Sequence, residues 1–188
     1  MEALMIGVSG MRGTIGGTLT PAVISQMASA LATWLKKTQQ PRNGTHFRVA
    51  FGRDSRPSGP WVRDAAVAAL CASGIEVIDL DIVTTPGVAM MVKWLNADAG
   101  CMVTASHNPI EWNGLKFLNS SSVAPPPADA AAIIDLYRSG ATSFVPVQQI
   151  VAPSRNTETH ALHTKRVLDY VDVLGISAKR YKVVLDSV

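Results

Sequence analysis

Apolar and polar positions alternate along the chain in short blocks that predict strands followed by helices. Four apolar runs have the length of strands, at residues 6–9, 47–51, 75–80 and 99–103. Three helices are predicted between or after them, at residues 21–38, 59–72 and 86–95. Thr20 suits the cap of the first helix, Pro21 its first position, and a glycine-rich loop is expected at residues 10–17. This alternation predicts an α/β fold, a layered α/β/α domain with a mixed, mainly parallel sheet flanked by helices.

The remainder of the chain has a weaker pattern. Three elements are predicted there: a short strand at residues 115–118 and helices at residues 128–138 and 156–174. Gly175 would end the last helix. The apolar residues of the segment 182–188 then predict a strand that enters a core. No turn, helix or polar tail follows this strand, and we therefore expect the chain to be an amino-terminal piece of a longer one.

Composition narrows the class of ligand. The net charge is only +3 and the basic residues are dispersed, which favours a small anionic ligand over a nucleic acid. Cys71 and Cys101 lie in apolar stretches, where they are expected to be buried rather than to form a disulfide or a metal site. No apolar run is long enough to cross a bilayer and the first residues lack a signal-peptide pattern, so we expect a cytoplasmic protein.

Chemistry-bearing side chains gather where the strand at residues 99–103 ends. Ser106 and His107 follow that strand directly, and Pro109 prevents its simple continuation. An Asn-Gly pair at residues 113–114 indicates a turn, which would bring Lys116 back near the serine. A serine beside a cation and an imidazole suits phosphoryl chemistry, because the cation favours anionic forms of the serine and the imidazole can move a proton.

Several motifs together resemble one family, the α-D-phosphohexomutases, which include phosphoglucomutases, phosphomannomutases and phosphoglucosamine mutases. Thr-Ala-Ser-His-Asn-Pro at residues 104–109, followed by Asn-Gly-Leu-Lys at residues 113–116, resembles the family's active-site signature. Ser-Gly-Met-Arg-Gly at residues 9–13, Gly-Arg-Asp-Ser-Arg-Pro-Ser-Gly at residues 52–59 and Thr-Pro at residues 85–86 match in the same order and spacing. The resemblance covers residues 5–188 and is specific because several motifs agree.

The resemblance implies roles for four residues. Ser106 would carry a phosphoryl group and, through a phosphoryl oxygen, provide a ligand to Mg²⁺. Lys116 would contact that group and is a candidate general base, while Arg12 would belong to the phosphoserine environment. His107 would donate or accept protons at substrate hydroxyls. The implied reaction interconverts hexose 1-phosphate and hexose 6-phosphate, of glucose or mannose, through a hexose 1,6-bisphosphate that also acts as activator.

The resemblance also implies a division into domains. Residues 1–153 would form domain I with the phosphoserine loop, and residues 154–188 the linking helix and first strand of a truncated domain II. The partners would be the hexose phosphate substrate and domains II–IV of a parent chain. The family's Asp-Gly-Asp-x-Asp-Arg metal loop, which lies in its second domain, does not occur in this sequence. We therefore expect the 188-residue chain alone to be inactive.

Alternative functions are weighed against this one. A phosphoglucosamine mutase would keep the reaction and change the sugar, and a non-catalytic phosphosugar-binding domain would describe the chain in isolation. A serine hydrolase ranks low, because the sequence has no Gly-x-Ser-x-Gly elbow.

For two polar segments we favour a structural role over contact with a ligand or a metal. In residues 52–59, an internal ion pair among Arg53, Asp54 and Arg56 is favoured over direct contact with a ligand. Asp79 and Asp81 are expected at the end of a strand rather than on a metal, and the family usually has a glycine near Asp81, so the turn there is expected to differ.

Overall fold

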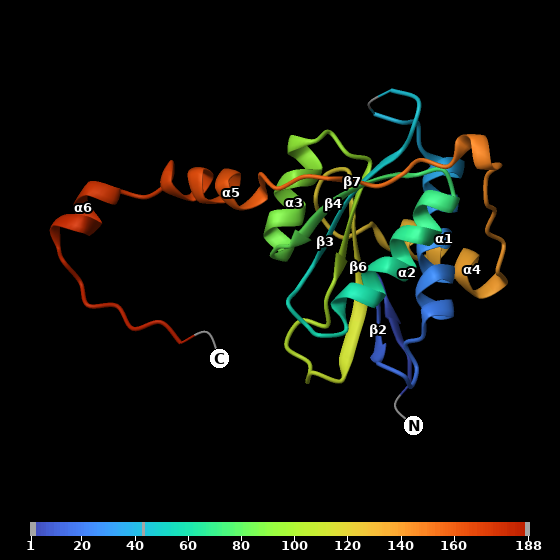
Figure 1. The fold of residues 1–188 in the computed structure, drawn as a ribbon, viewed down its shortest axis with the longest axis horizontal. Coiled ribbons are helices and arrows are strands. Elements are labelled where there is room, and N and C mark those ends of the chain that lie inside the picture. Colours follow the sequence, from blue (N-terminus) through green and yellow to red (C-terminus); the bar gives the residue numbers. More distant parts are fainter. Residues whose placement is uncertain (1–2, 43, 187–188) are drawn as a thin grey trace.

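The computed structural model describes residues 3–42 and 44–186 and shows one sheet with helices on both faces (Figure 1). Within these ranges the seven-stranded sheet has the order β1-β2-β6-β5-β3-β4-β7. The strands are β1 (Met5–Gly7), β2 (Gly10–Thr14), β3 (Arg48–Arg53), β4 (Glu76–Ile82), β5 (Ala99–Val103), β6 (Trp112–Asn119) and β7 (Ser154–Arg155). The predicted α/β/α layering and the mixed sheet are confirmed.

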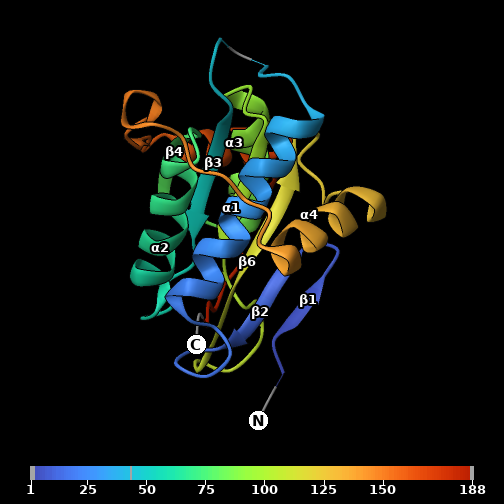
Figure 2. The ribbon, with the colours of Figure 1, turned by 90° about the vertical axis from the view of Figure 1, so that its right-hand side faces the viewer.

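Helices α1, α2 and α4 cover one face of the sheet, and α3 covers the other (Figure 2). The helices are α1 (Pro21–Thr38), α2 (Gly59–Ala72), α3 (Thr85–Trp94), α4 (Pro127–Ser139), α5 (Thr159–Leu168) and α6 (Val173–Ala178), with a short 3-10 helix, η1 (Val147–Gln149). None of these helices is both long and apolar enough to traverse a membrane. The cytoplasmic location expected from the sequence stays a prediction.

Strand direction divides the sheet into two halves. β5, β3, β4 and β7 run parallel, whereas β1, β2, β6 and β5 pair antiparallel in that order. Parallel pairing therefore prevails in only one half. The reason is the connection from β5 to β6, which is too short for a crossover helix and returns the chain antiparallel.

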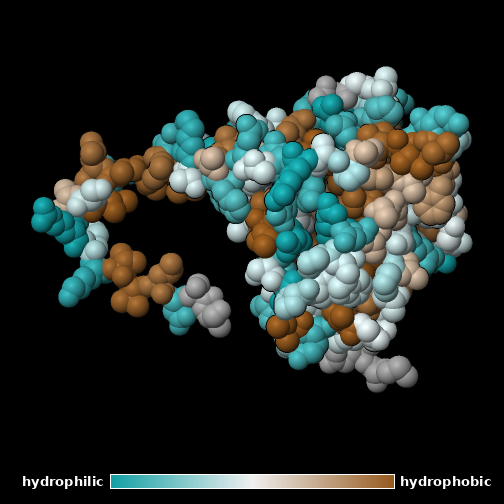
Figure 3. Space-filling model, viewed as in Figure 1, coloured by the Kyte–Doolittle hydropathy of each residue, from teal (hydrophilic) through white to brown (hydrophobic). Residues whose placement is uncertain are grey.

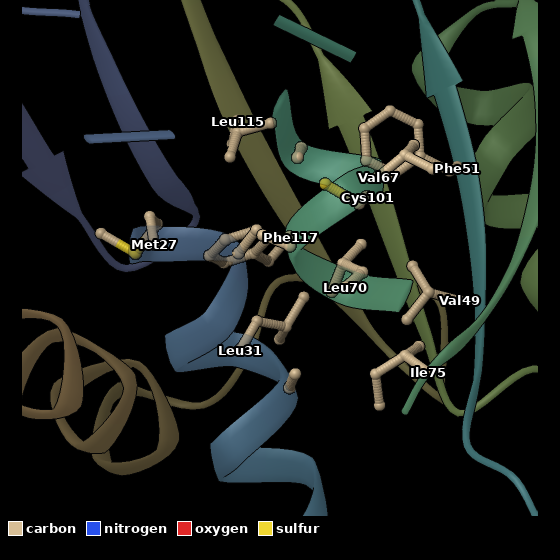
Figure 4. Close-up of a cluster of buried hydrophobic side chains, with 14 of the residues drawn as sticks. Met27, Leu31, Val49, Phe51, Val67, Leu70, Ile75, Cys101, Leu115 and Phe117 are labelled. Atoms are coloured by element: carbon tan, nitrogen blue, oxygen red, sulfur yellow. The ribbon is translucent and has the colours of Figure 1, made fainter. Parts of the chain in front are cut away.

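Side chains of the strands alternate between two cores. Val49 and Phe51 of β3 and Cys101 of β5 pack against α1 and α2 in the larger core (Figure 4). Ala50 and Met102, on the opposite face, pack against α3 in the smaller core. Burial raises the pKa of the Cys101 thiol, which stays protonated and behaves as the buried apolar side chain expected from the sequence.

The strongest local signals are confirmed in the structure. The helices α1 and α2 and the strand β5 begin and end at the predicted residues. The side chain of Thr20 caps α1 by accepting a hydrogen bond from the backbone N–H of Val23 at 3.4 Å, and Pro21 starts the helix as expected.

The prediction of a glycine-rich loop over residues 10–17 is wrong for its first part, because Gly10–Thr14 form β2. This strand pairs with β6 from Gly10 opposite Lys116 to Thr14 opposite Trp112. Backbone hydrogen bonds to β6 hold it, so β2 needs few of the branched or aromatic side chains by which strands are recognised in a sequence.

The predictions for the last part of the chain need two corrections. The helix expected over residues 156–174 is divided into α5 and α6, because Asp172 caps α6 by accepting a hydrogen bond from the N–H of Gly175 at 2.9 Å. Gly175 therefore does not end the helix as expected but lies inside α6, which continues to Ala178. The strand expected at residues 182–188 is not formed over residues 182–186, where no described strand pairs with it, and residues 187–188 lie outside the described residues. The domain boundary after residue 153 stays a prediction; β7, just beyond it, pairs with β4.

The chain leaves the body of the domain after α5. Leu162 of α5 packs on the smaller core beside α3, and the following residues extend away from the sheet (Figure 1). Figure 3 shows that hydrophobic side chains gather along this extension. Leu174, Val184 and Leu185 are among the exposed large hydrophobic residues of this part of the chain.

The strands β2 and β6 approach each other closely at two glycines. A Cβ atom on Gly114 would overlap the carbonyl oxygen of Met11, and one on Gly10 would overlap the carbonyl oxygen of Leu115. Gly10 also has φ +124°, which residues with a side chain rarely adopt. The antiparallel ladder that holds β2 in the sheet therefore depends on glycine at both positions.

We expect Gly114→Ala to lower the free energy of unfolding by about 1–3 kcal/mol, because the added methyl group meets rigid backbone. Gly7→Ala in β1 is the matched control, since a Cβ there meets no atom within 4 Å. Urea unfolding followed by circular dichroism measures both. Equal effects of the two substitutions would contradict the close approach of β2 and β6.

Candidate active site around Ser106

Ser106 lies in the connection between β5 and β6, at the carboxyl end of β5. It has φ +59°, a left-handed conformation that is unfavourable for a residue with a side chain. The hydroxyl of Thr104 accepts a hydrogen bond from the Ser106 N–H at 2.9 Å, and the Ala105 carbonyl accepts one from the Asn108 N–H at 3.2 Å. Backbone strain of this kind is often found at functional sites, where surrounding contacts maintain it.

The exposed Ser106 borders a pocket of about 260 Å³. Its lining comes from β1, β2, β5–β6 and the start of α3, and the polar side chains in it are Ser9, Arg12, Thr85, Thr104, Ser106 and Lys116. Three of the four residues expected from the sequence, all except His107, thus border one pocket.

Strand register places the two cations on the same side of the sheet. In the β2–β6 ladder Arg12 lies opposite Gly114, and Gly10 lies opposite Lys116. Arg12 and Lys116 are therefore diagonal neighbours on one face, within reach of a shared ligand. Arg12 lies on a strand, not in a loop as its glycine neighbours suggested.

The predicted turn at Asn113 and Gly114 is wrong. Both residues lie inside β6, and Lys116 is placed by pairing opposite Met102 of β5. The fully buried Asn113 side chain has its own partners: Oδ1 accepts from the Gly114 N–H at 2.8 Å, and Nδ2 donates to the hydroxyl of Ser58 at 2.9 Å. Pairing with β2 and β5 therefore overrides the local turn preference of this Asn-Gly pair.

The pocket is electropositive. In the described part of the chain, neither Arg12 nor Lys116 has a carboxylate within ion-pair distance. Thr85 is the first residue of α3 and lines the same pocket, so the positive end of that helix dipole also lies there. Two unneutralised cations and a helix N-terminus favour an anion.

His107 is exposed and lies beside Ser106 rather than in the pocket lining. Its Nδ1 is 3.4 Å from the Ser106 hydroxyl oxygen, within hydrogen-bond reach. An imidazole in this place can exchange a proton with a hydroxyl that approaches the serine.

The loop after β3 is hydrogen-bonded to the loop that holds Ser106. Arg56 pairs with Asp54 at 3.3 Å, the kind of internal ion pair that the sequence favoured, whereas Arg53 pairs with Asp81 at 2.9 Å. Arg56 also donates hydrogen bonds to backbone carbonyls of the loop that holds Ser106. No pattern in the sequence indicated this contact, because the two loops are about fifty positions apart.

The acidic residues at the end of β4 are engaged with arginines. Asp79 pairs with Arg63 at 2.6 Å, and Asp81 pairs with Arg53 and with Arg155. Asp81 has φ +58°, the region that glycine adopts most easily. Across the residues that the structure describes, no group of three or more His, Cys, Asp or Glu side chains is placed to hold a metal ion.

Comparisons with known proteins agree on one family. The family model described as phosphoglucomutase/phosphomannomutase, alpha/beta/alpha domain I, matches residues 3–143. A phosphoglucosamine mutase of Pediococcus pentosaceus is 44% identical over 124 residues, which cover 64% of this chain and 26% of that protein. A phosphoglucomutase/phosphomannomutase of Thermococcus kodakarensis is 31% identical over 183 residues, which cover 97% of this chain and 39% of that protein.

A solved structure gives the same result. The structure of a putative phosphomannomutase from Thermus thermophilus superposes with a TM-score of 0.77 and 25% identity, covering 93% of this chain and 37% of that one. The chain thus spans between 26% and 39% of the length of the two curated relatives named above. Its motifs, its fold and these matches place the chain in the phosphoglucomutase/phosphomannomutase family, of which it carries the α/β/α domain I.

Proposed function

We propose that Ser106 is the phosphoryl-carrying residue of a phosphohexomutase that interconverts hexose 1-phosphate and hexose 6-phosphate, of glucose or mannose. The observation that supports this most is the placement of an exposed, strained serine on a pocket with two unpaired cations, Arg12 and Lys116. A phosphoryl group on Ser106 would add a charge of about −1.5 to −2, which those cations would balance.

In the proposed reaction, a hydroxyl oxygen of the hexose monophosphate attacks the phosphorus on Ser106. A new P–O bond forms to the sugar while the bond to the Ser106 oxygen breaks, and the product is a hexose 1,6-bisphosphate. After the bisphosphate reorients, its other phosphoryl group returns to Ser106. His107 takes the proton of the attacking hydroxyl, and Arg12 and Lys116, as cations, stabilise the charge on the transferring group. Such transfer depends mainly on position and electrostatics.

The proposed reaction includes Mg²⁺, but this chain would supply only part of the metal site. The described residues include no carboxylate cluster that fits the ion. This chain would supply one ligand, a phosphoryl oxygen on Ser106, and the remaining ligands would have to come from elsewhere.

A second candidate is a phosphoglucosamine mutase. It is favoured by one observation: several relatives with 38–44% identity over 111–124 residues bear that name, whereas a phosphoglucomutase/phosphomannomutase relative is 31% identical over 183 residues. Coupled assays of the complete gene product with the 1-phosphates or 6-phosphates of glucose, mannose and glucosamine distinguish the two. The preferred sugar is the one with the highest kcat/KM.

We expect Ser106 to be the residue that is stably phosphorylated when the complete gene product is incubated with a hexose 1,6-bisphosphate. Phosphopeptide mapping measures this, with Ser106→Ala expected to abolish incorporation. Ser9→Ala is the control, because Ser9 lines the same pocket. Stable phosphate on Ser9 or Ser55 with Ser106 unmodified would refute the assignment.

We expect Lys116→Met to lower kcat by about 10²–10³-fold while KM changes little, because the proposed role of Lys116 is to stabilise charge on the transferring group in the transition state. Lys93→Met, at the exposed end of α3 and outside the pocket, is the control and should leave both constants unchanged. Steady-state kinetics on the complete gene product decides. A raised KM with normal kcat would assign Lys116 to ground-state binding instead.

We expect the 188-residue chain by itself to fold and yet to isomerise hexose phosphates at least about 10³-fold more slowly than the Thermococcus kodakarensis relative. The two cores close within the described residues, but a substrate held only by this pocket is poorly positioned. A coupled mutase assay with Mg²⁺ and a hexose 1,6-bisphosphate measures the difference. Similar turnover of the two proteins would show that the pocket alone is sufficient.

A further inference from the structure

One arginine outside the pocket lining holds the serine loop. The Arg56 guanidinium donates to three backbone carbonyls of that loop, Asn108 at 2.6 Å, Pro109 at 2.7 Å and Ser106 at 3.0 Å, and to that of Trp112, the first residue of β6, at 3.2 Å. Its side chain is only 14% exposed and does not line the pocket. Together with the bond from its Nε to Asp54, these contacts occupy all three nitrogens of the guanidinium group.

Arg56 is itself anchored to the sheet. Asp54 accepts hydrogen bonds from both the backbone N–H and the Nε of Arg56, at 3.1 and 3.3 Å. The backbone N–H of Asp54 donates to the carbonyl of Val103, the last residue of β5, at 3.0 Å. The guanidinium therefore has a fixed position relative to the strand from which the serine loop departs.

This anchoring bears on the direction of the Ser106 side chain. At φ +59° the Ser106 backbone is strained, and rotation of its peptide units toward negative φ would relieve the strain. Such a rotation would turn the Ser106 carbonyl away from Arg56 and the Cα–Cβ bond away from the pocket. The hydrogen bond from Arg56 to the Ser106 carbonyl opposes this rotation directly, because the rotation would break a charge-assisted hydrogen bond. The bonds from Arg56 to Asn108, Pro109 and Trp112 hold the chain that follows Ser106 in place.

We propose that Arg56 is a positioning residue that maintains the left-handed conformation of Ser106 and so directs its hydroxyl into the pocket. The proposal rests on the function proposed above for Ser106, and it adds a residue that acts without contact with the phosphoryl group or the sugar. The planar guanidinium is needed, because a lysine ammonium cannot span four carbonyls in fixed directions.

The first test reads the loop directly. Hydrogen exchange of the 188-residue chain, resolved by NMR or mass spectrometry, should show residues 104–112 exchanging about tenfold faster in Arg56→Ala than in wild type. Arg48→Ala is the matched control, since Arg48 is a paired arginine at the opposite end of β3. If Arg56→Ala fails to unfold cooperatively, Arg56→Lys replaces it and is expected to show the same direction of change. Unchanged exchange in the loop would overturn the proposal.

The second test separates positioning from substrate binding. In the complete gene product, Arg56→Ala should lower kcat about 100-fold with KM within about twofold, and millimolar guanidinium ion should restore part of the rate. Arg48→Ala should show neither effect. A raised KM with normal kcat would overturn the proposal, because it would mean that Arg56 binds substrate. If wild-type Ser106 takes up no phosphate, the proposed function fails, and the exchange experiment still decides whether Arg56 fixes the loop.

Discussion

The insertion of β6 between β2 and β5, antiparallel to both, is the constraint on which the site depends. It requires the chain to turn back within the eight residues between β5 and β6, and Ser106 lies in this connection at the carboxyl end of β5. The same pairing fixes which residues of β2 and β6 lie side by side, and so brings Arg12 and Lys116 to one face. The ladder closes only because Gly114 and Gly10 have no side chain to separate the two backbones.

Much of the fold could be predicted from local sequence, because its signals are local. The cap at Thr20, the amphipathic pattern of α1 and the apolar run of β5 depend on residues close in the chain. The strand β2 could not be recognised, because its partner lies about a hundred positions away and its glycines carry no strand signal. The strand expected at residues 182–188 is the opposite case, because its apolar residues carry a local strand signal. Over residues 182–186 no strand forms, since a strand also requires a partner to pair with.

For the candidate site, the sequence identified the residues but not how the fold brings them together. The motif identified Ser106, Lys116 and Arg12 as residues that would lie together, yet Lys116 reaches the pocket by strand register instead of a turn. The contacts of Arg56 with the serine loop had no sequence signal. The resulting pocket contains two cations without carboxylate partners in the described residues, and mutual repulsion makes such a pocket less stable when it holds no anion. A phosphoryl group would relieve that repulsion, so catalysis and stability would favour the same occupant.

The two cores differ in size, and both α3 and α5 pack on the smaller one. It holds α3, whose first residue lines the pocket, and it also receives Leu162 of α5, from which the exposed extension departs. Elements that share a small core tend to open as one cooperative unit. A fluctuation that loosens α3 would therefore disturb one wall of the pocket and the contact of Leu162 with the smaller core at the same time.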